Sequence, residues 1–456
     1  MPKSGGRPRL WSVRDYRLLW TSNGFGDIGA SFASLAMSVT AVLTLHASAL
    51  EVAVIEALGN GAYLVLGVPV GAWADHVPPK RLLVAADAAR FLAVLSVPIA
   101  FAMHALTIAQ LIGVAAVTSA AGVVFDIAHT TVLPSIVGRD RVAAASAQLS
   151  TVDSTVTVVA PGLAGAVIAR TAGPVAYVVT AAVHFGSSIA AAAMRTVPDR
   201  RATLPASASA EAPRFMRSVT EGLRYVLATP LQRTYMFAAA SVNLGAGMLG
   251  AMQALFVLRS LGMSSAQFGI ALSVGGIGGI VGAALGMRIR GALGEIRTQV
   301  LCYALLPIAV APMPLAPFLP IPVTASIAAE EFLVSFLIVV ASISTSGIYA
   351  RITPERLFGR VTAARRTIGV GVIPLGSLFA GVLAPLVGYD ATIWIGAALM
   401  FGSVPIFFSS PVGRQRDLPP EWEAPPSLST PPTTGAPSSS AAPLTASDDA
   451  SPASAG

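Results

Sequence analysis

Residues 71–82 read GAWADHVPPKRL, which places the carboxylate of Asp75, two prolines and the Lys80–Arg81 pair in one short turn. A long apolar run precedes this turn, and another follows it at once. Similar apolar runs of about 20 residues, the length that one helix needs to cross the hydrocarbon of a bilayer, recur along the chain. The turn is therefore predicted to join two membrane-spanning helices.

The composition also indicates a membrane protein. Of the 456 residues, 54% are hydrophobic and 11% are charged, whereas a soluble domain has about 25% charged residues. A soluble chain of this length would divide into domains joined by polar linkers, and most of this chain lacks them. We predict an all-α integral membrane protein whose surrounding solvent is lipid.

Signatures of catalysis and of cofactor binding are absent from the sequence. It contains no G-x-x-x-x-G-K-[ST] phosphate loop, no H-E-x-x-H motif and no cluster of Cys and His. We therefore expect no enzymatic activity, no cofactor, no metal and no ATP-driven step. We attribute the net charge of +7 to basic residues in the inner loops of a membrane protein rather than to a nucleic-acid-binding surface.

Hydrophobic periodicity predicts twelve transmembrane helices. They run over 20–46, 51–74, 81–104, 106–130, 142–171, 173–194, 231–258, 265–290, 297–318, 321–350, 359–388 and 390–409. The only long polar segment among them separates the sixth helix from the seventh. The predicted organisation is an N-terminal segment at 1–19, a six-helix lobe at 20–194, an inter-lobe linker at 195–230, a second six-helix lobe at 231–410 and a disordered tail at 411–456.

Basic residues lie predominantly on one side of this predicted topology. With the N-terminus inside, 26 of the 29 Lys and Arg residues fall in inner segments, and only Arg170 and Arg259 fall in outer loops. Such an asymmetry is the positive-inside rule of membrane proteins. It predicts a multi-pass protein of the plasma membrane with both termini and the linker in the cytoplasm.

The two predicted lobes resemble each other in sequence. LPSIVGRDRVAAASA at 133–147 is similar to ITPERLFGRVTAARR at 352–366, and APGLAGAVIA at 160–169 is similar to IPLGSLFAGVLA at 373–384. Parallel six-helix pseudo-repeats of this kind build two-lobed transporters. Chance similarity between helices rich in Gly, Ala and Pro is the alternative.

The opening stretch resembles the loop motif G-x-x-x-D-[RK]-x-[GP]-x-[RK]-[RK] of the major facilitator superfamily. The residues at its motif positions are Gly71, Asp75, Pro78, Lys80 and Arg81, and His76 departs from the basic residue usual after the aspartate. The segments RDYRLLW and FGRVTAARRTIGVGVIPLGSLFAG further resemble the enterobactin-exporter and macrolide-efflux branch. The resemblance covers residues 14–410 and implies the twelve-helix major facilitator fold.

The resemblance also implies roles for two motifs. Asp75 would meet the start of the eleventh helix near Arg360 and latch the inner side of the transporter shut. The segment APGLAGA at 160–166 is similar to the fifth-helix motif of antiporter members. Its Pro161, Gly162 and Gly165 are expected to bend that helix and pack it closely.

Polar side chains within the apolar spans are the remaining candidates for function. A carboxylate at bilayer depth is costly and is a functional hypothesis by default, and low dielectric raises the pKa of a carboxyl group toward neutrality. The proton-coupling candidates, in order of preference, are Asp27, Glu331, Asp153 and Glu330. Residues that share a helical face with such groups are cavity-lining candidates: Asn23, Ser31, Ser34, Asn60, Tyr63 and Ser335. Asn23, Asp27, Ser31, Ser34 and Ser38 form one polar stripe along the first helix, for which a seam of small residues that pack against another helix is the alternative.

These features predict a secondary active transporter. The preferred function is proton-coupled export, by alternating access, of small amphipathic organic molecules such as drugs or siderophores, because apolar walls with few fixed charges suit lipophilic cargo. The expected partners are small-molecule cargo, protons and membrane lipids, with no nucleic acid, and the protein is expected to be a monomer. The alternatives are an importer of a small solute with the same fold and a non-transporting membrane sensor.

Overall fold

The computed structural model of the protein describes residues 10–74, 76–171, 173–195, 223–354 and 358–422. Within these ranges, twelve helices are long and apolar enough to cross a membrane. The predicted all-α fold and its helix count are therefore confirmed.

Six spans form the first lobe. The start of the chain also contributes a short 3-10 turn, η1 (Leu10–Ser12). The spans are α1 (Arg14–Val39) continued by the π-helical η2 (Thr40–Thr44), α2 (Ala49–Ala74), α3 (Pro79–Ala102), α4 (Ile108–Val137), α5 (Val142–Arg170), which follows the turn η3 (Arg139–Arg141), and α6 (Gly173–Ala193).

The other six spans form the second lobe, and three of them are interrupted. The spans are α8 (Pro230–Leu255) continued by the π-helical η6 (Phe256–Ser260), α9 (Ser265–Leu293), α10 (Glu295–Val310) continued by α11 (Pro312–Leu315) and η7 (Ala316–Phe318), α12 (Val323–Ile352), α13 (Phe358–Val387), and α14 (Tyr389–Phe401) followed by α15 (Ser403–Phe408). Of the predicted linker, 195–230, the structure describes residues 195 and 223–230, of which 223–228 are helical.

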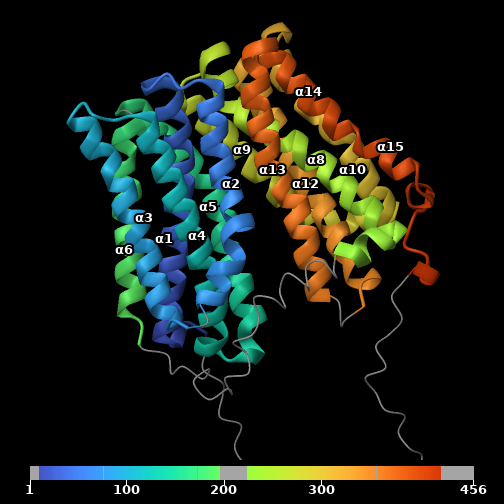
Figure 1. Ribbon diagram of the computed structural model, residues 1–456, viewed down its shortest axis with the longest axis horizontal. Coiled ribbons are helices and arrows are strands. Elements are labelled where there is room, and N and C mark those ends of the chain that lie inside the picture. The colour runs from blue at the N-terminus through green and yellow to red at the C-terminus, as the bar shows by residue number, and fades with distance from the viewer. Residues whose placement is uncertain (1–9, 75, 172, 196–222, 355–357, 423–456) are drawn as a thin grey trace, which may run out of the picture.

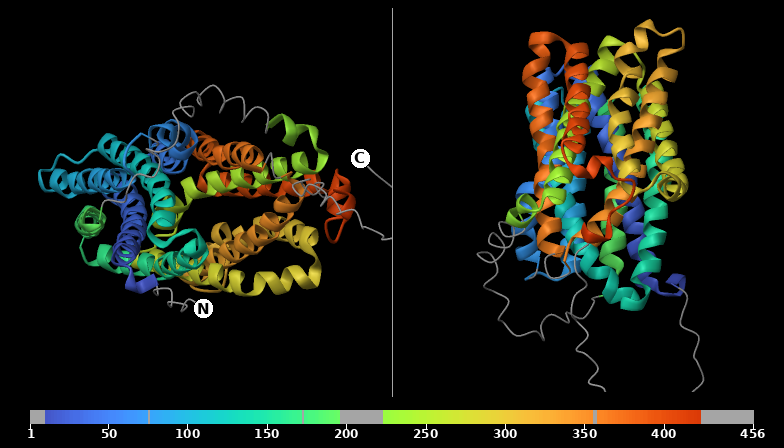
Figure 2. Two further views of the ribbon diagram at one scale, coloured as in Figure 1. Left: turned by 90° about the horizontal axis from the view of Figure 1, so that it is seen from below. Right: turned by 90° about the vertical axis from the view of Figure 1, so that its right-hand side faces the viewer.

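The two lobes stand side by side, with α1 to α6 on the left and α8 to α15 on the right of Figure 1. We call the end of the bundle where α1 begins the proximal end, and the opposite end the distal end. The ribbons of the two lobes lie together near the distal end and diverge toward the proximal end, as Figures 1 and 2 show.

Glycines bring the lobes into backbone contact near the distal end. A Cβ atom added to Gly165 of α5 would lie 2.5 Å from the carbonyl oxygen of Ser265, and one added to Gly269 of α9 would overlap the carbonyl oxygen of Pro161. The N–H of Gly162 donates to Oγ of Ser273 at 2.9 Å. The fifth-helix motif thus forms part of the lobe interface.

A second glycine contact closes the other side of the same interface. A Cβ atom on Gly381 of α13 would meet the Ala53 side chain and the Leu50 backbone of α2. The guanidinium of Arg259, in η6, donates to the carbonyl oxygen of Val42, in η2, at 2.9 Å. Both contacts join segments at the distal end.

Local geometry repeats between the lobes at the ends of α1 and α8. Both helices finish in a π-helical turn, and the second turn follows the first by 216 residues: Thr40–Thr44 and Phe256–Ser260. His46 and Gly262 both have positive φ angles, 52° and 65°. These matched turns support the pseudo-repeat at a place where the two sequences differ.

The first residues of the predicted tail pack on the second lobe. Leu418 is buried, and its N–H donates to the carboxylate of Glu295 at 3.2 Å. The backbone N–H of Glu295 in turn donates to the carboxylate of Asp417 at 3.0 Å. Order extends past residue 411, through the turns η9 (Pro411–Arg414) and η10 (Pro420–Trp422), because this segment caps the start of α10. Residues 423–456 lie outside the described ranges.

The close approach of α5 and α9 at Gly269 can be tested with Gly269→Ala. The added methyl group would force the α5 and α9 backbones apart, and overpacking of this kind costs about 1–3 kcal/mol. We expect a lower melting temperature in detergent and a longer distance between spin labels on the distal ends of α5 and α9.

The matched control is Gly113→Ala in α4, where the added Cβ would have no neighbour within 4 Å. Alanine is the better helix former, so this variant should be as stable as the parent protein or slightly more stable. An equal response of the two variants would contradict the proposed role of Gly269.

Candidate functional site

A central cavity of about 550 Å³ lies between the lobes. The first lobe contributes most of its wall through α1, α2 and α4, together with Arg90 of α3 and His184 of α6. The second lobe contributes Gly250 and Ala254 of α8 and Val370 of α13. Because residues of both lobes line the cavity, the contacts of a ligand bound there would change when the lobes move relative to each other.

Three of the predicted cavity-lining residues lie in this wall: Ser34, Asn60 and Tyr63. Asn23, Ser31 and Ser335 are not among its lining residues. Asn23 instead lies one helical turn from Asp27 and donates its amide N–H to the Asp27 carboxylate at 2.8 Å.

Asp27, the preferred proton-coupling candidate, lies close to the cavity but not in its wall. The side chain is partly buried, and it lies within electrostatic range of Asp153, Asp126 and Arg90. Of these three, Asp126 and Arg90 line the cavity, and Asp153 is exposed on α5. The structure thus brings Asp27 and Asp153 into one charged group.

Asp87 is the charged residue of this region that the sequence analysis missed. It is fully buried on α3, with Oδ1 3.6 Å from Nη1 of Arg90 and 3.9 Å from Nδ1 of His184. The hydroxyl of Ser187 donates to its Oδ2 at 2.5 Å, and that hydroxyl also lies 2.9 Å from Oγ of Ser22. Asp87 therefore connects α1, α3 and α6 through polar contacts. The i, i+3 spacing of Asp87 and Arg90 within an apolar run was the available signal.

Two glycines make room for this network. A Cβ atom on Gly122 would lie 2.9 Å from the Arg90 guanidinium, and one on Gly29 would lie 2.8 Å from the His184 ring. The Arg90 guanidinium also lies 5.2 Å from the centre of the Phe125 ring, a cation–π arrangement that stabilises a cation away from water. His184 is thus packed between Gly29 and the Asp87 carboxylate.

The second lobe supplies a separate acidic pair on α12. Oε1 of Glu331 accepts a hydrogen bond from the Gln253 amide at 2.6 Å, and its side chain packs on Gly275 of α9. Glu330 is 4% exposed, and its Oε2 has no hydrogen-bond partner among the described residues. A buried polar group without a hydrogen-bond partner is costly, so Glu330 remains a functional candidate, as any carboxyl group at bilayer depth is.

The loop motif is only partly described. Gly71 lies in the last turn of α2 in a partly buried position, Pro78 precedes α3, and Arg81 is exposed. The Lys80 ammonium donates to the carbonyl oxygen of Met194, at the end of α6, at 2.5 Å. Asp75 and the side chain of Arg360 lie outside the described residues, so the latch between them stays a prediction.

The arrangement suits binding and proton transfer. Carboxyl groups within membrane spans and beside a cavity can exchange protons when water reaches them. No group of three His, Cys, Asp or Glu side chains that could hold a metal ion occurs in the described part of the chain.

Comparisons with known proteins agree with this geometry. The sequence profile of a family described as "transmembrane secretion effector" matches residues 11–430. The multidrug efflux pump Tap of Mycolicibacterium fortuitum is 28% identical over 370 residues, which cover 77% of this chain and 85% of Tap.

Solved structures share the fold. A bacterial homologue of the iron transporter ferroportin, in an inward-facing state, has a TM-score of 0.67 and 14% identity over 88% of this chain and 99% of its own. The nucleoside transporter NupG has a TM-score of 0.66 and 12% identity over 86% of this chain and 99% of its own.

The buried pair on α3 can be tested with a double-mutant cycle. Arg90→Met should lower the free energy of unfolding by about 3 kcal/mol, because it leaves the Asp87 carboxylate buried without its cation. Asp87→Asn combined with Arg90→Met should cost less than Arg90→Met alone. Unfolding in detergent micelles measures all four proteins, and strictly additive effects would show that the two residues do not interact.

Proposed function

Because the chain belongs to the transmembrane secretion effector family of the major facilitator superfamily, we propose that it exports small amphipathic organic molecules in exchange for protons. The chain is a multi-pass membrane protein of a transporter family, not an enzyme. The proposed details are the outward direction of transport, the class of cargo and the coupling to protons. Export of a drug-like cargo also accords with the similarity to an efflux pump.

The observation that carries the proposal is the central cavity and its polar groups. Its wall is formed largely by small and apolar side chains, which suit a lipophilic molecule. Its polar groups all belong to the first lobe: the charged side chains of Glu56, Arg90 and Asp126, and the side chains of Ser34, Ser38, Asn60, Tyr63, Thr118, Ser119 and His184. The Glu56 carboxylate accepts from the Asn60 amide at 2.9 Å and lies against Gly250 of the opposite lobe. It would therefore meet cargo where the lobes face each other.

The arrangement of the lobes, in contact at the distal end and apart at the proximal end, fits one of the two end states of an alternating-access cycle. With both termini in the cytoplasm, as the distribution of basic residues predicts, the proximal end faces the cytoplasm. The distal contacts then close the outer side, and cargo would enter from within the cell. Release outside requires the α5–α9 and α2–α13 contacts to part and the proximal ends to meet.

Asp27 is the proposed proton carrier. It lies beside the cavity, within range of Arg90, so that a change in its protonation alters the charge balance of the network that joins α1, α3 and α6. Cargo and proton would thus compete for one region of the first lobe. Glu331 and Glu330 are the corresponding candidates in the second lobe, and Asp153 is a further acid beside Asp27.

Asp27→Asn should bind cargo and lose proton-driven transport, because the amide cannot take up and release the proton. Fluorescent organic cations in everted membrane vesicles, with an imposed pH gradient, measure the transport, and quenching of tryptophan fluorescence measures the binding. Asp390→Asn, an exposed carboxylate in the first turn of α14, is the control and should behave as the parent protein. Unchanged proton-driven transport by Asp27→Asn would exclude Asp27 as the carrier.

The direction of transport needs a separate measurement. In everted vesicles acidified inside, an exporter should accumulate the dye and release protons from the lumen, and a protonophore should stop both. Dye that leaves the vesicles together with protons would instead identify an importer and overturn the proposed direction.

A further inference from the structure

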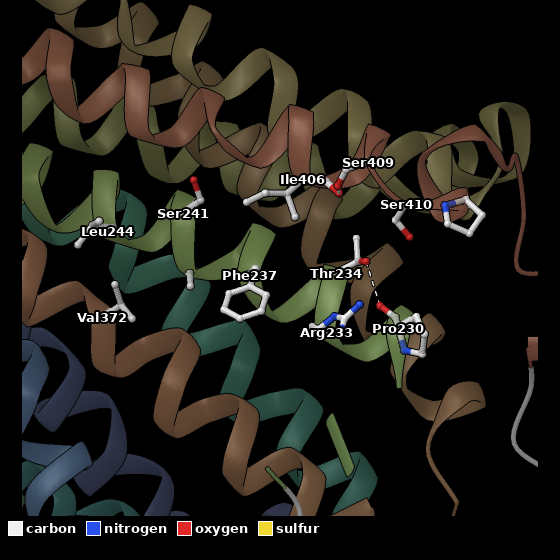
Figure 3. Close-up of a pocket in the computed structure, with 12 residues that line it drawn as sticks. Pro230, Arg233, Thr234, Phe237, Ser241, Leu244, Val372, Ile406, Ser409 and Ser410 are labelled. Carbon is white, nitrogen blue, oxygen red and sulfur yellow. Dashed lines mark hydrogen bonds between the residues drawn. The ribbon is translucent and has the colours of Figure 1, made fainter. Parts of the chain in front are cut away.

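A second cavity, of about 560 Å³, lies in the second lobe between α8, α13 and α15. Figure 3 shows its walls, with Phe237 and Leu244 of α8, Val372 of α13 and Ile406 of α15 around it. None of its lining residues belongs to the central cavity. Phe237 is 48% exposed, so the cavity is a groove open to the surroundings of the helix bundle, which in a membrane are lipid.

The groove is polar at one end and mainly apolar along its length, where the Ser241 hydroxyl donates to the carbonyl oxygen of Leu399. Arg233, Ser409 and Ser410 gather at the proximal end, and the side chains of Phe237, Ile406, Val372 and Leu244 follow toward the distal end (Figure 3). Arg233 and Leu244 are 11 residues apart on α8, which corresponds to about 16 Å at the rise of an α-helix. This length is close to half of the roughly 30 Å of hydrocarbon in a bilayer. The groove is therefore about as long as the acyl region of one leaflet is deep.

The charge at the polar end is uncompensated. The Arg233 side chain is exposed, and no carboxylate of the described residues lies within ion-pair distance of it. The hydroxyl of Ser410 accepts from the N–H of Val412 at 3.4 Å, which leaves its own hydrogen available to another acceptor. A guanidinium and a hydroxyl at this position match the phosphodiester of a lipid headgroup.

We propose that this groove is a binding site for an anionic glycerophospholipid. Its phosphodiester accepts hydrogen bonds from Arg233 and Ser410, and one acyl chain lies along α8 past Phe237 to Leu244. The bound chain would fill the space between α13 and α15 that protein side chains leave open. The site depends on the membrane location of the chain and not on its cargo. Its test is therefore independent of the proposed export.

Native mass spectrometry of the purified full-length protein in detergent, titrated with phosphatidylglycerol or with phosphatidylcholine of the same acyl chains, tests the site. A cation near an anionic lipid surface contributes about 1 kcal/mol, so phosphatidylglycerol should bind about fivefold more tightly than phosphatidylcholine. Arg233→Ala should remove this preference. Arg288→Ala, an exposed arginine near the proximal end of α9, should retain it.

A second variant tests the acyl part of the groove. Ala240→Phe places a ring among the lining side chains of α8 and should weaken binding of both lipids while leaving the melting temperature of the lipid-free protein unchanged. Glycerol 3-phosphate, which carries the phosphate without the acyl chains, should not displace phosphatidylglycerol.

Three results would overturn the site. They are equal weakening by Arg233→Ala and Arg288→Ala, equal affinity for the two lipids, and displacement of the lipid by glycerol 3-phosphate. Displacement of phosphatidylglycerol by a transported dye would assign the groove to cargo instead.

Discussion

Backbone contact between the lobes at the distal end is the interaction on which the rest of the structure depends. Gly165 and Gly269 allow α5 and α9 to touch, and Gly381 allows α13 to touch α2. These contacts hold the lobes together at one end of the bundle, and the lobes diverge toward the other end. Contacts of this kind consist of many weak dispersion interactions, and they can part without exposing an unpaired charge to lipid.

The hydrogen bonds described across this interface can also break and re-form without separating two ions. Arg259 donates to the carbonyl oxygen of Val42, which belongs to a π-helical turn, and Gly162 donates to the Ser273 hydroxyl. Neither bond joins two ionised groups. A closed distal end held by neutral acceptors and close packing suits a transporter whose two end states must be similar in free energy.

Charge within the membrane is distributed unequally between the lobes. The first lobe holds a network in which Asp87 lies against Arg90, Ser187 and His184, and Asp27 lies within range of Arg90. The second lobe holds an acidic pair on α12, of which Glu331 accepts a hydrogen bond from the Gln253 amide. Because a buried ion requires a partner, the first lobe can hold a charge in place through the Asp87–Arg90 pair, and no such cation lies beside the acidic pair among the described residues of the second lobe. Proton uptake would therefore affect the two lobes differently.

The sequence by itself determined that lipid is the solvent of this fold, that twelve helices cross it, and that a polar segment divides them six and six. These properties depend on the hydrophobicity of continuous segments, and such segments can be counted along the chain. It also indicated Asp27, Glu331 and Ser34 as candidates for function, since each is a polar residue in an apolar run. It could not say which of these candidates lie close to one another. Only the tertiary structure decided that Asp87 meets Ser187, 100 residues away, that Gly165 meets Gly269, and that the lobes touch at the distal end. Such pairings depend on how helices pack, and packing is set by side-chain volume at contacts between segments far apart in the sequence.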